Sequence, residues 1–389
     1  MLGKFPSRRI LRCLSQNVTT PFPEFPEFSS HTELYQYSIN NVDDFWARVA
    51  RSHLNFAQDF TSTRDIDLSR GQIEWFKGGK LNASYNCLDR HLATKSDQIA
   101  LIWEGDEPGD EETVTYKQLH TMTCKVANVL KSLGVTQGDR VAIYMPSCIL
   151  AAACMQAIVR LGACHAVVFA GFSAEALRQR INDSGANVVI TMDSAYRGGR
   201  EVKLQETVLQ ALSNASCPTV THLLVTKRTG SKIENSKLST QIEQVDLDAE
   251  MLTADSYCKP VPMDSEAPLY LMYTSGSTGQ PKGLMHTTAG FLCHQSLGMR
   301  HAWDIREGDV LGCVADIGWQ VGHSMTVYGA LVIGGTGFLF ESTPVYVSCH
   351  FTICSGLIRT CSPILDDIGA RLKNGNLPNF SPPRLRTVC

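Results

Sequence analysis

Hydrophobic and polar positions follow two different periods through the middle of the chain. Short apolar runs typical of buried strands cover Val141–Met145, His165–Phe169 and Asn187–Thr191. Between them, Ile149–Leu161 and Ala174–Asp183 have the length and spacing of helices. Strands and helices that alternate this closely predict a parallel sheet covered on both faces. We therefore expect an α/β fold of mainly parallel sheets with helices on both faces.

Similar patterns extend to either side of this central region. Further helices are expected over Val42–Phe60, Thr115–Leu133 and Gly290–Met299. Further strands are expected over Ile99–Glu104, Leu269–Met272 and Val310–Val314. Ser173 suits the N-cap position of the helix that follows it. The stretch Gly230–Asp255 is polar with few aromatic residues, and we expect it to be an irregular surface region.

Composition narrows the class of protein. The 389 residues are enough for two or three domain-sized cores, and 43% hydrophobic and 19% charged residues are a globular balance. A formal net charge of -3 gives no support for nucleic-acid binding. The 14 cysteines include no C-x-x-C pair, so they predict reduced core residues rather than a metal site. The most apolar region, Ile149–Ala170, contains Arg160 and His165, so we expect no membrane span.

The N-terminal segment has a composition of its own. Residues 1–20 contain Lys4, Arg8, Arg9 and Arg12 and no acidic residue. This composition predicts a mitochondrial presequence and a matrix location. A disordered basic tail on a cytosolic protein is the alternative. A spacer of interleaved prolines and phenylalanines leads to residue 30.

The stretch Tyr273–Gly283 carries the strongest chemical signal. It follows an apolar strand and combines hydroxyl residues and glycines with a Pro-Lys-Gly exit. Glycine lets the backbone approach an anion, successive N–H groups can surround phosphate oxygens, and lysine adds a compact positive charge. The spacing is not that of a Walker A loop, in which Gly-Lys directly precedes Ser or Thr. A flexible Ser/Gly turn is the alternative to this phosphate loop.

This loop resembles the signature loop of the AMP-forming adenylate synthetases. Phe76–Asn82 and Asn86–His91 resemble the acetyl-CoA synthetases within that superfamily. The resemblance implies an acetate–CoA ligase that converts ATP, acetate and coenzyme A into AMP, diphosphate and acetyl-CoA, with Mg²⁺ accompanying ATP. It assigns ATP phosphate binding to Thr274, Ser275, Gly276, Ser277, Thr278, Gly279 and Lys282.

A second loop contains two arginines around two glycines. Arg197, Gly198, Gly199 and Arg200 follow a strand, and guanidinium groups bind phosphate by bidentate contacts. A solvated turn would have the same spacing, so the residues alone leave both interpretations open. The resemblance to acetyl-CoA synthetases implies that this loop contacts the nucleotide end of coenzyme A.

The segment Ala315–Ser324 resembles the part of acetyl-CoA synthetases that lines the acyl pocket and the thiol channel. The resemblance places Trp319, Gln320 and Val321 in the acyl pocket and Val321 also at coenzyme A. The family has a small aliphatic residue and then Thr at the positions of Gln320 and Val321, which puts the acetate preference in doubt. Asp316 and His323 are assigned to structure rather than to proton transfer. His286 is read as a polar residue at a helix start in preference to a ligand contact.

The resemblance covers residues 31–346. We expect four regions: a presequence and spacer (1–30), an acetyl-CoA synthetase N-terminal region (31–110), a partial AMP-binding domain (111–346) and an unmatched tail (347–389). The family's adenine and ribose motifs and its lid lysine have no match here, so we expect a truncated or spliced form that is inactive alone. A non-catalytic fragment that binds nucleotide or pairs with another chain is one alternative. Self-association through exposed apolar surface is a further expectation. A ligase for another short-chain carboxylate such as propionate is the other.

Overall fold

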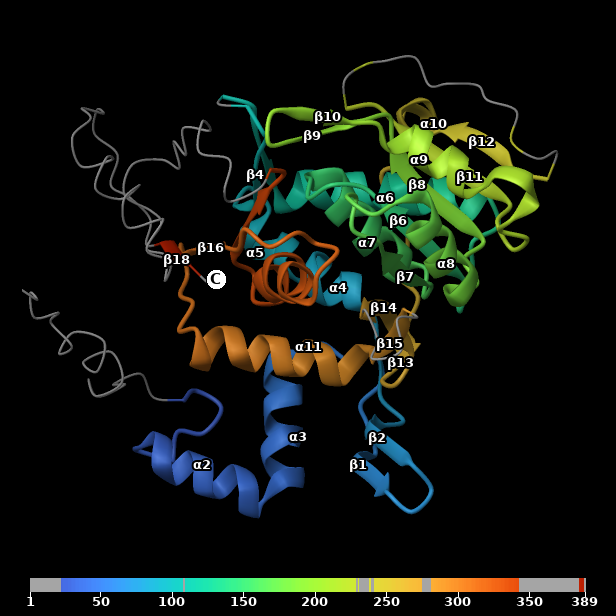
Figure 1. The fold of residues 1–389 in the computed structure, drawn as a ribbon. Helices are drawn as coiled ribbons and strands as arrows, with labels where there is room; N and C mark the ends of the chain where they lie inside the picture. The colour runs from blue at the N-terminus through green and yellow to red at the C-terminus, as the bar shows by residue number, and fades with distance from the viewer. Residues whose placement is uncertain are drawn as a thin grey trace, which may run out of the picture. The chain divides into compact units, whose positions relative to one another are not determined.

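Apolar strand segments assemble into two large sheets in the computed structural model. The structure describes residues 22–107, 109–228, 230, 238, 241–274, 281–342 and 385–387. The chain falls into two units, Met1–His53 and Leu54–Cys389. Both sheets belong to the second unit. The expected α/β class is confirmed (Figure 1).

The first sheet has seven strands in the order β12-β11-β8-β6-β7-β14-β15. They are β6 (Arg140–Tyr144), β7 (Cys164–Val167), β8 (Val188–Met192), β11 (His222–Thr226), β12 (Glu243–Asp246), β14 (Pro268–Thr274) and β15 (Lys282–Thr287). Every neighbouring pair is parallel except β14 with β15. The strands β6, β7 and β8 fall within two residues of the predicted apolar runs.

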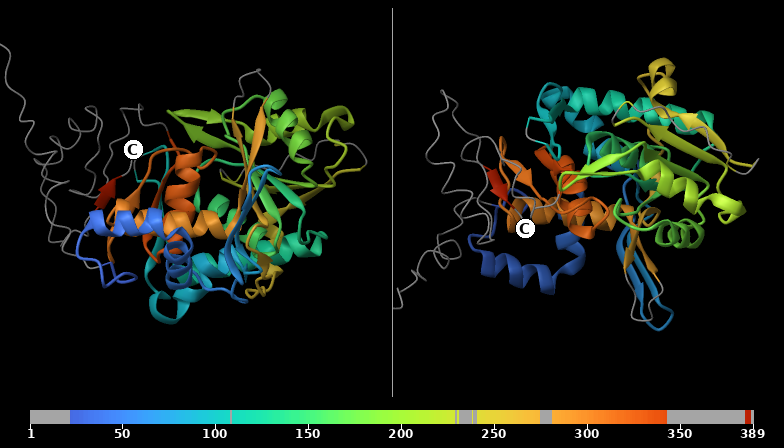
Figure 2. Two further views of the ribbon diagram at one scale, coloured as in Figure 1. Left: turned by 90° about the horizontal axis from the view of Figure 1, so that it is seen from below. Right: turned by 45° about the horizontal axis from the view of Figure 1, so that its top comes forward.

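The second sheet has five strands in the order β18-β16-β17-β4-β5. They are β4 (Ile99–Glu104), β5 (Glu111–Thr115), β16 (Val310–Gly312), β17 (Thr336–Phe340) and β18 (Leu385–Thr387). Only β4 and β5 pair in antiparallel fashion. Figure 2 shows the orange strands of this sheet apart from the green strands of the first.

Helices cover both faces of the first sheet (Figures 1 and 2). They include α6 (Tyr116–Ser132), α7 (Ile149–Arg160), α8 (Ala174–Ser184), α9 (Leu204–Ala211) and α10 (Leu247–Thr253). All α7 residues but Leu150 are buried, because α7 contacts β6 and β7 of the first sheet and β4 of the second. The predicted N-cap is confirmed, since Ser173 Oγ accepts a hydrogen bond from the Ala176 N–H at 3.3 Å.

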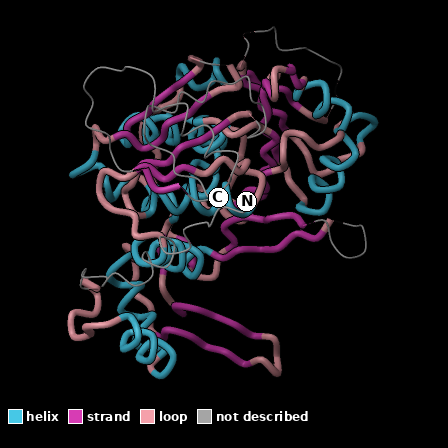
Figure 3. The backbone as a smooth tube through the Cα atoms, turned by 60° about the vertical axis from the view of Figure 1, so that its left-hand side comes forward, coloured by secondary structure: helices cyan, strands magenta, loops and turns pink. Residues whose placement is uncertain are grey.

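The remaining elements of the second unit are antiparallel strand pairs, helices and single turns. The antiparallel pairs are β1 (Ser62–Asp67) with β2 (Gln72–Lys77), which Figure 3 shows as paired magenta strands, β3 (Lys80–Leu81) with β13 (Met263–Asp264), and β9 (Ala195–Arg197) with β10 (Arg200–Val202). The helices are α4 (Ala83–Cys87), α5 (Leu92–Lys95), α11 (Thr288–Leu297) and α12 (Ala330–Val332). The single turns are η1 (Asp89–His91) and η2 (Ser213–Ala215), and η3 (Gly298–Ala302) and η4 (Gly322–Gly329) are π-helical.

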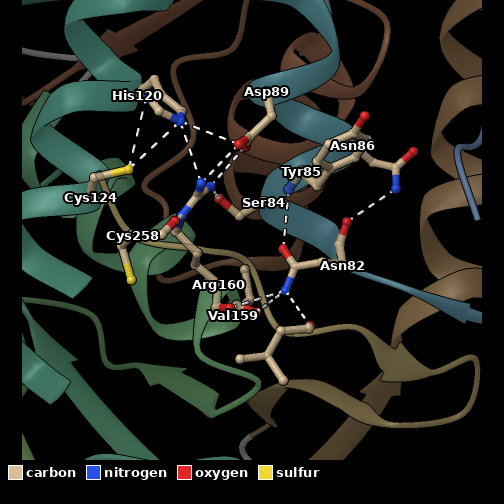
Figure 4. Close-up of polar contacts among 11 residues, drawn as sticks. Asn82, Ser84, Tyr85, Asn86, Asp89, His120, Cys124, Val159, Arg160 and Cys258 are labelled. Carbon is tan, nitrogen blue, oxygen red and sulfur yellow. Dashed lines mark hydrogen bonds and ion pairs between the residues drawn. The ribbon is translucent and has the colours of Figure 1, made fainter. Parts of the chain in front are cut away.

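A buried polar network fixes α4 against α7 (Figure 4). The Asn82 amide donates to the carbonyl oxygens of Val159 at 3.0 Å and Val261 at 2.8 Å, and its Oδ1 accepts from the Tyr85 N–H as the N-cap of α4. One side chain thereby satisfies groups from two distant segments and from its own helix, which places residues 82–91 on the core of the second unit.

The first unit consists of α2 (His31–Asn40), α3 (Val42–His53) and the segment before them. Ser30 Oγ caps α2 by accepting from the Glu33 N–H at 3.2 Å. The Phe25 ring stacks on Phe45 at 5.0 Å between centroids, and the Arg48 guanidinium lies 4.4 Å from the Phe25 centroid. This aromatic contact holds the segment against the helices.

The predicted extent of the first helix and the predicted irregular region are wrong. The helix expected over Val42–Phe60 ends at His53, because the Asn86 side chain binds both the N–H and the carbonyl oxygen of Asn55 in place of helical partners. The region expected to be irregular contains β12 and α10, because β12 pairs with β11 and Asp246 caps α10 through the Ala249 N–H.

Membrane-spanning helices and cysteines can be assessed in the described part of the chain. None of its helices is long and apolar enough to cross a membrane. Its nine cysteines are all buried: Cys87, Cys124, Cys148, Cys154, Cys164, Cys217, Cys258, Cys293 and Cys313. The other cysteines of the sequence lie outside the described residues.

Candidate active site

The expected phosphate loop connects two antiparallel strands, β14 and β15. Thr274 and Lys282 face each other across this ladder, and both are exposed. Ser275, Gly276, Ser277, Thr278 and Gly279 lie outside the described residues. The Tyr273 hydroxyl, next to the loop, donates to Asp183 Oδ2 at 2.8 Å and so attaches the end of β14 to α8. The two ends of the loop are therefore fixed opposite one another.

The Arg-Gly-Gly-Arg loop is the turn of the hairpin β9–β10. Arg197 pairs with Arg200 across the ladder, and the two glycines between them have φ of +61° and +74°. Two consecutive left-handed residues define a type I′ turn, for which Gly-Gly is a preferred sequence. We expected the motif to lie in a loop. Its two glycines form the loop of the hairpin, whereas Arg197 is the last residue of β9 and Arg200 the first residue of β10.

The carboxylate of Asp106 occupies the N–H groups of this turn. Its Oδ1 accepts from the Gly198 N–H at 2.7 Å, and its Oδ2 accepts from the Gly199 N–H at 2.6 Å. Asp106 is 1% exposed. The amides are thus bound to a carboxylate of the chain itself, while Arg200 remains exposed and Arg197 half-buried.

The turn before η4 carries the three residues expected at the acyl pocket. Trp319 and Val321 are 49% and 41% exposed. Gln320 is half-buried, and its Nε2 donates to the Tyr270 hydroxyl at 3.0 Å. A Cβ at Gly318 would lie 2.9 Å from the backbone N and Cα of Phe169, so only glycine lets this turn approach so closely.

Aromatic rings connect this turn to the arginine hairpin. The Trp319 ring lies 5.8 Å from Phe169 and 6.3 Å from Phe172 between centroids. The Arg197 guanidinium lies over Phe169, 4.5 Å from its centroid. On the other side, the Arg180 guanidinium lies 4.4 Å from Phe172. The three aromatic rings therefore lie between two guanidinium groups, and one of these belongs to the Arg-Gly-Gly-Arg motif.

This row of contacts continues to the phosphate loop. Arg180 also lies 5.7 Å from the centroid of Tyr273, the residue before Thr274. The structure thus brings Arg197, Trp319 and the end of β14 together through Phe169, Phe172 and Arg180. Sequence reasoning missed these three connecting residues. The only prediction made near them was the N-cap at Ser173, the residue after Phe172.

Asp316 and His323 hydrogen-bond to backbone groups of the turn itself. Asp316 Oδ1 accepts from the Gly318 N–H at 2.7 Å, and His323 Nδ1 lies 3.0 Å from the Ile317 carbonyl oxygen. Burial raises the pKa of Asp316 to about 6 and lowers the pKa of His323 to about 3. His323 is therefore neutral at physiological pH. These contacts support the structural assignment of both side chains.

The helix-start position expected for His286 is wrong. His286 lies in β15, and its ring stacks on Tyr270 with centroids 4.4 Å apart. The following helix begins at Thr288, because β15 extends through Thr287 before the chain turns. The stacking places His286 beside the ring of Tyr270, whose hydroxyl group is hydrogen-bonded to Gln320.

Comparison with known proteins adds independent information. A profile of the AMP-binding enzyme family matches residues 88–360, and a profile of the acetyl-coenzyme A synthetase N-terminus matches residues 31–87. The chain is 46% identical over 317 residues to an acetyl-coenzyme A synthetase of Saccharophagus degradans, a match that covers 81% of this chain and 48% of the relative. It is 50% identical over 302 residues to the human protein "Acetyl-coenzyme A synthetase 2-like, mitochondrial", with 78% of this chain and 43% of the relative covered.

A solved structure agrees in fold. Acetoacetyl-CoA synthetase from Streptomyces lividans matches with a TM-score of 0.73 at 23% identity, over 83% of this chain and 48% of that chain. The chain spans about half the length of the curated relatives it matches.

Proposed function

The chain belongs to the AMP-binding enzyme family, and from that premise we propose that it supplies the phosphate-binding and coenzyme A-binding parts of an acetate–CoA ligase. The proposed reaction joins acetate to coenzyme A with conversion of ATP to AMP and diphosphate. Relatives named acetyl-coenzyme A synthetase, at 46% and 50% identity, support this substrate class.

The row of side chains from Arg197 to Trp319 carries the proposal. A guanidinium group suits the phosphates at the nucleotide end of coenzyme A, and the exposed indole of Trp319 suits an apolar ligand segment. Phe169 holds both side chains through its ring. A ligand that reaches from Arg197 to Trp319 would therefore extend from a charged end to an apolar end, as coenzyme A does.

ATP is proposed to bind at the loop between β14 and β15. Thr274 and Lys282 flank it, and Ser275, Gly276, Ser277, Thr278 and Gly279 supply hydroxyl groups and backbone N–H groups. Such groups hold phosphate oxygens and the Mg²⁺ that accompanies ATP. Phosphoryl chemistry depends mainly on positioning and charge neutralisation, so a fixed loop base contributes to the first half-reaction.

We propose the same four regions of the chain that the sequence predicts, namely residues 1–30, 31–110, 111–346 and 347–389. For residues 1–20 we propose a mitochondrial presequence, which the basic composition and the name of the human relative support. A basic tail on a cytosolic protein is the competing proposal.

Coenzyme A binding tests the proposal directly. Titration calorimetry on the full chain is expected to detect coenzyme A, and Arg197→Ala is expected to weaken it at least tenfold because a charge-assisted contact is lost. Arg70→Ala is the matched control, since Arg70 is an exposed arginine of the hairpin β1–β2 and should leave affinity unchanged. Absence of binding, or equal affinity in both variants, contradicts the proposal.

Gln320 favours a second candidate, a ligase for a different short carboxylate. Its amide is held by Tyr270 beside Trp319, where it offers a polar contact to the acyl group. Pyrophosphate release with acetate, propionate and no acid separates the candidates. Under the second candidate, Gln320→Val shifts the preference toward acetate, whereas under the first it leaves the ratio of rates unchanged.

A further inference from the structure

A carboxylate of the protein occupies the turn of the hairpin β9–β10. Asp106 follows β4, a strand of the five-stranded sheet, while the hairpin follows β8 of the seven-stranded sheet. The two hydrogen bonds from Gly198 and Gly199 measure 2.7 and 2.6 Å and join segments 92 and 93 residues apart in sequence. In Figure 1 the tip of the hairpin lies near the end of β4.

The geometry of the turn makes this contact specific. Both glycines have positive φ, and successive N–H groups in such a turn form a concavity that binds anions. Asp106 fills this concavity with one oxygen on each N–H group. A charged acceptor forms stronger hydrogen bonds than a neutral one, and burial at 1% exposure protects them from water.

Two further acceptors come from the end of β17. Ser342 Oγ accepts from the Gly198 N–H at 3.3 Å. The Glu341 carboxylate accepts from the backbone N–H of Tyr196, the middle residue of β9. The hairpin that begins in one sheet is therefore fixed by three side chains at the ends of β4 and β17 in the other.

We infer that Asp106 is a positioning residue that locks the hairpin so that Arg197 and Arg200 present their guanidinium groups to the phosphates of coenzyme A. The inference rests on the proposed function, because it takes the ligand from there. In this arrangement the N–H groups of Gly198 and Gly199 bind Asp106. The phosphates of coenzyme A are therefore recognised by the side chains of the two arginines. Removing the lock frees the hairpin and disorders both guanidinium groups without touching the ATP loop.

The test compares Asp106→Asn with wild type on the full chain. Asparagine keeps the size of the side chain and one acceptor oxygen but loses the charge and the second acceptor. Calorimetric titration with coenzyme A is expected to show at least tenfold weaker binding, while affinity for ATP with Mg²⁺ changes less than twofold. Asp67→Asn, at a half-buried aspartate of the hairpin β1–β2, is the control and should change neither affinity.

Amide hydrogen exchange gives a readout that needs no ligand. Exchange at Gly198 and Gly199 is expected to accelerate at least tenfold in Asp106→Asn and less in Ser342→Ala, which loses only the longer bond. Unchanged exchange in Asp106→Asn overturns the lock, and so does an equal loss of coenzyme A and ATP affinity. If wild type binds no coenzyme A while exchange still depends on Asp106, the proposed ligand is wrong but the lock stands.

Discussion

Arg160 and Asp89 form a doubly hydrogen-bonded ion pair between α7 and η1, with Nη1 2.7 Å from Oδ2 and Nη2 2.8 Å from Oδ1 (Figure 4). The Arg160 side chain is fully buried, and the Asp89 side chain is 14% exposed. The Arg160 Nε–H also donates to the Cys258 carbonyl oxygen at 2.5 Å. This pair joins the segment after α4 to the last turn of the helix that lies between the two sheets.

Asp89→Asn is expected to destabilise the chain by about 3–5 kcal/mol, because it leaves the Arg160 charge buried and without its anionic partner. Asp67→Asn breaks the surface pair in which Arg70 is exposed and Asp67 half-buried, and it should cost less than about 1 kcal/mol. Urea unfolding of both variants measures the contrast. Equal free energies of unfolding for the two variants would show that the buried pair contributes no more to stability than the surface pair.

Stability should also fall at alkaline pH through His120, whose Nε2 lies 3.3 Å from Asp89 Oδ1. Burial alone would lower the pKa of His120, but hydrogen bonds with Asp89 and Cys124 raise it to about 9. A raised pKa contributes stability that is complete below about 6.5 and is lost as pH rises through about 9.

Unfolding measured from pH 6 to 9.5 checks this dependence. The difference in free energy of unfolding between wild type and His120→Gln should shrink steadily over that range. A difference that stays constant refutes the alkaline effect.

At acid pH, Asp89 makes stability depend on pH in the opposite direction. Burial alone would raise the pKa of Asp89, but hydrogen bonds from Arg160 and His120 lower it to about 2. That stability is present above about pH 4 and is lost as pH falls through about 2.

Gly318→Ala should cost about 1–3 kcal/mol, since the added Cβ meets the Phe169 backbone at 2.9 Å and forces the turn away. Gly290→Ala is the matched control, because Gly290 lies inside α11 with no atom within 4 Å of an added Cβ. It should stabilise the chain by about 0.5–1 kcal/mol. Thermal unfolding should show a lower Tm for Gly318→Ala and a higher Tm for Gly290→Ala. An unchanged Tm in Gly318→Ala would mean that the turn can move to accommodate the added Cβ.

The central sheet could be predicted because its signals are local. From β6 to β8, apolar runs alternate with helical spacing, and caps such as Ser173 mark the boundaries. The contacts of the candidate site have no such signal. Asp106 and Gly198 are 92 residues apart, and the sequence around either residue contains no pattern that predicts its contact with the other. The end of α3 at His53 was missed for the same reason, because a side chain from Asn86 decides it.

Import tests the proposed presequence. Replacing Arg8, Arg9 and Arg12 with glutamine keeps the length but removes the positive charge on which presequence recognition depends. The variant should remain in the cytosol by fluorescence microscopy and fractionation. Ser7→Ala with Ser15→Ala is the control and should still reach mitochondria. Normal import of the glutamine variant would exclude a charge-dependent presequence.

The nine buried cysteines have a kinetic consequence. Burial raises the pKa of thiols such as Cys87 and Cys148 to about 12, so they hold almost no thiolate at neutral pH. A thiol reagent can reach them only after the surrounding structure opens. Because the nine are distributed from α4 to the residue after β16, their separate labelling rates would map local opening across the described fold. A substrate that itself carries a free thiol would find no exposed protein thiol in this part of the chain with which to exchange.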